Sequence, residues 1–141
     1  MHISARVAVT LLLSQAVAST VAWACSCEPI TSTPAKLRDE HDRVFVGTVV
    51  DGPRGSGGCG GTVSSVDPLT YTLKVTEAFE GVEVGDDVEL TTARDDASCG
   101  VGFEVGSEWL IYTSTDTYML CDPGGRAEDH AADIEALRDA E

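Results

Sequence analysis

Cysteine is the residue type with the most chemistry to offer in this chain of 141 residues. The first two of its cysteines, Cys25 and Cys27, are separated by a single residue. Neither can easily bridge the other in an extended segment, so each needs a partner elsewhere in the chain. Cys99 and Cys121 follow turn or strand-end positions, whereas Cys59 lies in a glycine-rich stretch. Spacing alone leaves the pairing open, and Cys59 is the candidate for the odd thiol, which could join two chains into a dimer.

The first 24 residues have the features of a secretory signal peptide. A short basic start precedes a mostly apolar stretch, and Ala22-Trp23-Ala24 is an A-x-A cleavage site. A lipoprotein signal would also end before a cysteine, but it needs a branched apolar residue at position 22 and a small one at position 23. We therefore expect cleavage after Ala24, a secreted chain of residues 25–141, and paired cysteines in an oxidising compartment. The alternative is that residues 1–24 form an amphipathic first helix.

The charge balance excludes two classes of partner. The chain has 9 Lys and Arg against 24 Asp and Glu, a formal net charge of −15. Nucleic-acid binding depends on a basic surface, so no nucleic-acid partner is expected. An anionic membrane surface is disfavoured for the same reason, and we expect no membrane association.

The elements that must position the cysteines are mostly strands. Thr33 followed by Pro34 predicts the start of a short helix. The stretch from Tyr71 to Thr76 alternates between apolar and polar residues, which is typical of a half-buried antiparallel strand. Ala132, Ile134 and Leu137 form a weak apolar stripe on an acidic helix. The pattern predicts an all-β fold, a five-stranded OB-fold-like Greek-key barrel with a short N-terminal helix and a C-terminal helix. The expected elements are a helix at 33–42, strands at 43–50, 70–79, 87–92, 108–114 and 118–121, and a helix at 126–140.

Several motifs together resemble a known family. The predicted cleavage site is followed directly by Cys25-Ser26-Cys27, a Ser98-Cys99-Gly100 segment occurs later, and Cys121 lies near the end. The strand that begins VFVGTV and the strand that runs into Phe79-Glu80-Gly81 add weaker similarity. In these features residues 25–141 resemble the N-terminal, netrin-like domain of the tissue inhibitors of metalloproteinases (TIMPs). Similar single-domain chains occur in bacteria.

The resemblance implies a disulfide pattern, a function and a partner. In the family the first cysteine pairs with the cysteine of the S-C-G segment and the second with the later one, which implies Cys25–Cys99 and Cys27–Cys121 here. It further implies a secreted inhibitor, not an enzyme, whose partner is a zinc metalloprotease. Two departures are that neither predicted helix carries a cysteine for the third TIMP bridge and that the second TIMP domain is absent.

The residues around Cys25 have suitable chemistry for such inhibition. After cleavage, the α-amine and carbonyl oxygen of Cys25 would form a bidentate chelator for a catalytic zinc that belongs to the target. Ser26 would enter the substrate pocket beside that zinc. Cys27, Glu28 and Pro29 would continue this protease-binding wedge, and its second half would come from Ala97 and Ser98, which the implied bridge holds beside Cys25.

The alternative function is a non-inhibitory, secreted protein-binding module, in which the C-x-C motif only staples the chain end to the barrel. Other motifs are weak: the glycine-rich loop lacks the Lys-Ser/Thr of a phosphate-binding loop, and His41 and His130 lack metal-ligand spacing. We therefore expect no cofactor or resident metal.

Overall fold

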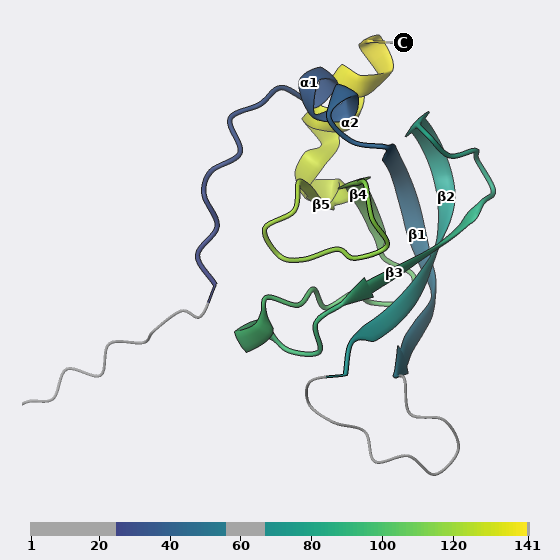
Figure 1. Cartoon of the computed structure of the whole chain (residues 1–141). Coiled ribbons are helices and arrows are strands. Elements are labelled where there is room, and N and C mark those ends of the chain that lie inside the picture. Colours follow the sequence, from purple (N-terminus) through teal and green to yellow (C-terminus); the bar gives the residue numbers. More distant parts are fainter. Residues whose placement is uncertain (1–24, 56–66, 141) are drawn as a thin grey trace, which may run out of the picture.

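The computed structural model describes residues 25–55 and 67–140. The predicted signal peptide and Cys59 lie outside these residues. The described chain is mainly β, with five strands, two α-helices and two short 3₁₀ helices (Figure 1). In chain order they are α1 (Pro34–Asp39), β1 (Arg43–Gly55), β2 (Leu69–Glu80), β3 (Asp87–Thr92), η1 (Asp96–Ser98), β4 (Glu108–Thr113), β5 (Gly124–Arg126), η2 (Ala127–His130) and α2 (Ala131–Asp139).

Helix α1 begins where local chemistry predicts. The side chain of Thr33 accepts a hydrogen bond from the backbone N–H of Lys36 at 3.4 Å, and Pro34 occupies the first turn, where no N–H is required. The helix ends at Asp39, three residues earlier than predicted.

The strands form one antiparallel sheet in the order β3-β2-β1-β4-β5. The alternation predicted for β2 is confirmed, because Tyr71, Leu73 and Val75 are buried while Lys74 and Thr76 are exposed. Strand β1 continues to residue 55, beyond the predicted end at residue 50, because its second half pairs with the start of β2. The register of that pair shifts between residues 46 and 47, so β1 is irregular at Gly47.

The fifth strand is not where the sequence pattern predicts it. The prediction of a strand at 118–121 is wrong: the strand that pairs with β4 is Gly124–Arg126. The Tyr118 N–H instead donates to the Thr91 carbonyl oxygen at 2.9 Å, next to a parallel bridge between Thr91 and Thr117. Residues 119–122 then form a turn, because a carboxylate oxygen of Asp122 accepts the Met119 N–H at 2.7 Å. Tyr118 is buried, so its side chain packs in the core although the residue is not part of a strand.

Two apolar clusters pack against the sheet. The larger cluster includes Phe45, Leu73, Leu90, Phe103 and Trp109, and the smaller one joins the sheet to α1 and α2. Residues 109–112 of β4 are all buried because successive side chains enter the two clusters alternately. On α2, Ile134 and Leu137 are buried as predicted, but Ala132 is exposed, since a residue two positions before Ile134 lies on the opposite side of a helix. Among the described helices, none is long and apolar enough to cross a membrane.

Candidate functional site

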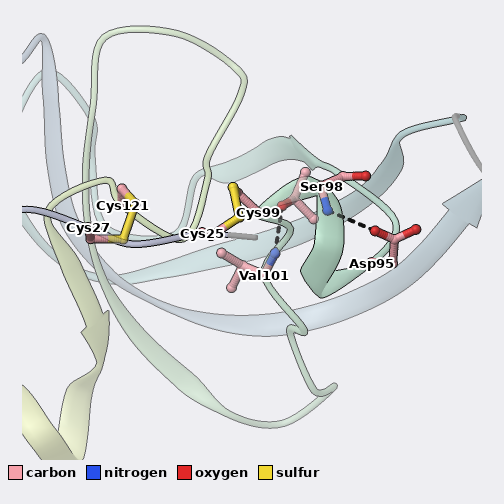
Figure 2. Close-up of a disulfide and its surroundings, with 8 residues drawn as sticks. Cys25, Cys27, Asp95, Ser98, Cys99, Val101 and Cys121 are labelled. Atoms are coloured by element: carbon pink, nitrogen blue, oxygen red, sulfur yellow. Dashed lines mark hydrogen bonds between the residues drawn. A yellow bond between two sulfur atoms is a disulfide. The ribbon is translucent and has the colours of Figure 1, made fainter. Parts of the chain in front are cut away.

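Two disulfides attach the N-terminal segment to the sheet. Cys25 pairs with Cys99, with 5.7 Å between their Cα atoms, and Cys27 pairs with Cys121, with 5.2 Å between theirs. These are the two bonds that the resemblance implies. Figure 2 shows both bridges along one short extended segment, so three parts of the chain far apart in sequence meet at this place.

The loop that carries Cys99 is held by three hydrogen bonds that its backbone N–H groups donate. The backbone N–H of Ser98 donates to a carboxylate oxygen of Asp95 at 2.9 Å, and the Gly100 N–H donates to the Asp95 carbonyl oxygen at 3.0 Å (Figure 2 shows the first bond). At the base of the loop, the N–H of Val101 donates to the hydroxyl of buried Thr92 at 2.8 Å. Side-chain capping of this kind orders a short loop before any partner binds.

The structure explains the residue type or conformation at two positions of the S-C-G segment, Cys99 and Gly100. Cys99 has a positive φ of 61°, the one such non-glycine among the described residues. This conformation is unfavourable for a residue with a side chain and persists only where the surroundings hold it. At Gly100 an added Cβ would lie 2.0 Å from the carbonyl oxygen of Ala93, so only glycine fits without a shift of the backbone. The loop therefore brings Cys99 to Cys25 in one defined conformation.

The predicted contact residues are accessible. Ser26, Cys27, Glu28 and Pro29 are exposed, as are Ala97 and Ser98 on the opposing loop, while Cys25 itself is half-buried. The structure thus brings together both predicted halves of the wedge, joined through the Cys25–Cys99 bond.

One further residue of this surface was not identified from sequence. Leu120 is 51% exposed, and its N–H donates to the carbonyl oxygen of Cys99 at 2.9 Å. The sequence pattern assigned Leu120 to a strand, and its position directly before Cys121 is the only sequence signal for a place beside the bridges. The hydrogen bond places Leu120 directly beside the loop that carries Cys99.

The histidines have local partners. His41 Nδ1 lies 2.6 Å from the carbonyl oxygen of Leu37, and His130 Nδ1 lies 2.8 Å from a carboxylate oxygen of Asp133. In the part of the chain that the structure describes, no three His, Cys, Asp or Glu side chains are grouped so that they could hold a metal ion.

No protein-family model and no curated protein matches this sequence.

Proposed function

We propose that the sheet is an OB-like Greek-key barrel of the netrin type. The support lies in the strand order, in which consecutive antiparallel pairs run from β3 through β2 and β1 to β4 and β5. The region that follows β4 returns to the free edge of β3 through the parallel Thr91–Thr117 bridge and the adjacent backbone hydrogen bonds. A five-stranded sheet whose two ends meet in this limited way is a partly open barrel.

We further propose that the protein is a secreted, TIMP-like inhibitor of zinc metalloendopeptidases. The observation that carries this proposal is the pair of disulfides that holds Cys25 against the Ala97–Cys99 loop and Cys27 against Cys121, with Ser26, Ala97 and Ser98 exposed. An exposed, extended segment with a second exposed loop beside it is suited to enter a protease cleft.

In this proposal the first residue of the mature chain, Cys25, coordinates the zinc of the target protease. A terminal α-amine has a pKa of about 7.7–8.0, so part of it is neutral at physiological pH. The α-nitrogen and carbonyl oxygen of Cys25 would then occupy the open coordination position of the target's zinc. Protonation competes with coordination, so inhibition should weaken as the pH falls below that pKa.

The bridges explain how a short segment could bind tightly. A flexible chain end loses conformational entropy when it enters a cleft, whereas a segment fixed at Cys25 and Cys27 has already lost much of it. Ser26 would reach the substrate pocket, Glu28 and Pro29 would extend the contact, and Leu120 would contribute apolar area beside Cys99.

The decisive experiment changes only the first residue. The mature chain beginning at Cys25 is assayed against a panel of zinc endopeptidases, beside a matched variant with one alanine added before Cys25. The addition converts the α-amine into an amide and places bulk at the metal, so inhibition should fall by at least about a hundredfold, roughly 3 kcal/mol.

The control is the fold of the extended variant. Peptide mapping should find the same two disulfides, and the thermal midpoint should equal that of the mature chain. Equal inhibition by both forms would contradict zinc chelation by the terminus. If neither form inhibits any member of the panel, the protein is a disulfide-stapled binding module instead.

A further inference from the structure

Glu28 has the only charged side chain among residues 25–29, the first half of the proposed wedge. The residue is exposed, and no described residue forms a hydrogen bond or an ion pair with its carboxylate. The charge of Glu28 is therefore stabilised by solvent and not by a neighbouring cation. A partner that covers this part of the surface has to remove that solvent.

The backbone at Glu28 has little freedom to withdraw from such a partner. The preceding residue, Cys27, is bonded to Cys121, and the following residue is Pro29, whose ring fixes its own φ. A residue before proline is itself restricted to extended conformations. Three residues of extended chain span at most about 10 Å, so Glu28 lies within that distance of Cys25, measured between Cα atoms.

The surroundings of Glu28 supply no positive side chain. The three segments that the two bridges join contain no Lys or Arg; they are residues 25–33, 95–102 and 118–125. Asp122 follows directly after Cys121, the bridge partner of Cys27, and adds a second carboxylate. Removing water from a carboxylate that has no cationic partner is strongly unfavourable. A cation for Glu28 therefore has to come from the partner protein.

We propose that Glu28 is a specificity-determining residue, which selects zinc endopeptidases with a lysine or arginine in the part of the cleft that receives the segment after Ser26. This inference rests on the proposed inhibition and adds the charge of the target's cleft to it. In a basic cleft, Glu28 exchanges solvent for an ion pair. In an apolar or acidic cleft it loses solvent and gains nothing, so one residue favours the first class of target and disfavours the second.

Two substitutions at this position test the inference. The mature parent protein, Glu28→Gln and Glu28→Lys are assayed against the panel of zinc endopeptidases at low and at high salt. For each protease that the parent inhibits, the inhibition constant should rise at least about fivefold in Glu28→Gln, which removes the ion pair. It should rise further in Glu28→Lys, which adds repulsion. Both losses should shrink at high salt because dissolved ions screen the charges.

Glu83→Lys is the matched control, because it makes the same charge change at another exposed glutamate. Glu83 belongs to the turn between β2 and β3, which Figure 1 shows on the far side of the sheet from residues 25–33. This variant should change inhibition less than about twofold, the scale of a screened charge outside the contact. All three variants should keep the thermal midpoint of the parent, since both side chains are exposed.

The outcomes separate this inference from the proposed inhibition. Equal inhibition by the parent, Glu28→Gln and Glu28→Lys would overturn the role of Glu28 and leave the inhibition in place. Tighter inhibition by Glu28→Lys, or an equal loss in Glu83→Lys, would do the same. If the parent inhibits no protease of the panel, the proposed inhibition fails and this inference fails with it.

Discussion

At the scale of single residues, Ser26 and Gly100 illustrate two different kinds of constraint. Ser26 lies between two half-cystines and is itself exposed, so its side chain is positioned by its neighbours but contributes little to packing. Gly100 has the opposite character, because the space that its side chain would occupy is filled by backbone. A change at Ser26 should affect binding, and a change at Gly100 should affect the stability of the fold.

Replacing Ser26 by glycine should weaken inhibition of pocket-dependent targets by about 1–2 kcal/mol, the scale of a small group lost from a pocket. Thermal stability should be nearly unchanged because the side chain is exposed. Ser26→Ala is the companion variant, since it removes the hydroxyl but keeps the Cβ atom and the stiffness of the backbone. Inhibition constants and thermal midpoints of the three proteins provide the measurement, and identical constants would show that Ser26 does not enter a pocket.

The Gly100→Ala change should lower the free energy of unfolding by about 2–3 kcal/mol, because the new Cβ meets the carbonyl oxygen of Ala93 and the loop must move. Gly102→Ala is the matched control, since no atom lies within 4 Å of the position of its Cβ. Urea unfolding of both variants gives the comparison. A destabilisation of Gly102→Ala as large as that of Gly100→Ala would contradict the steric explanation.

At the scale of elements, α2 is attached to the sheet by both apolar and charged contacts. Ile134 and Leu137 pack into the smaller cluster, and the guanidinium of Arg138 donates to both carboxylate oxygens of Glu77 on β2, at 2.6 and 2.8 Å. The hydrogen bond and charge of Arg138 hold the pKa of Glu77 below its usual value. The attachment of the C-terminal helix should therefore depend on pH.

The pH dependence follows from the lowered pKa of Glu77. The stabilisation is fully present above the pKa of the unfolded chain, about 4.3, and is lost as the pH falls through the lower pKa of the folded state. Glu77→Gln should therefore lower the thermal midpoint at pH 7, and its difference from the parent protein should shrink below about pH 4. Glu80→Gln, an exposed position on the same strand, is the control. A difference that persists unchanged at pH 2.5 would show that the ion pair is not its source.

At the scale of the whole molecule, the two disulfides span most of the described chain. Their sequence separations are 74 and 94 residues, so each restricts the unfolded state strongly, by at most about 4.5 kcal/mol on the chain-entropy formula. Both also join the chain's first described residues to loops at one end of the sheet. Their effect on stability and their effect on the wedge should be separable.

Replacing Cys27 and Cys121 together by alanine should reduce the free energy of unfolding by about 3 kcal/mol and weaken inhibition, because the segment after Ser26 is released. Cys59→Ala is the control and should leave both quantities unchanged if Cys59 is the odd thiol. Urea unfolding and inhibition assays under non-reducing conditions measure the two effects. Full inhibition by the double variant would show that the Cys25–Cys99 bond alone positions the wedge.

Local signals in the sequence determined a large part of this structure. The cap at Thr33, the alternation that begins at Tyr71 and the bounds of β3 at residues 87–92 were all predicted, because each depends on neighbours along the chain. The disulfide pairing was implied by resemblance to a family, since spacing left it open. Chemistry and resemblance together named the residues of the proposed wedge, and Leu120 was added to it only from the structure.

Tertiary structure alone decided the remaining features, because they depend on contacts between residues far apart in the chain. Residues 118–121 have β-forming side chains, but their backbone bonds to Thr91 and Cys99 and they do not pair with β4. Residues 124–126, which include two glycines, form that strand instead. The exposure of Leu120 depends on the same contacts. A pocket lined by Leu37, Tyr112 and Asp133 forms only where α1, β4 and α2 meet, so no local pattern encodes it.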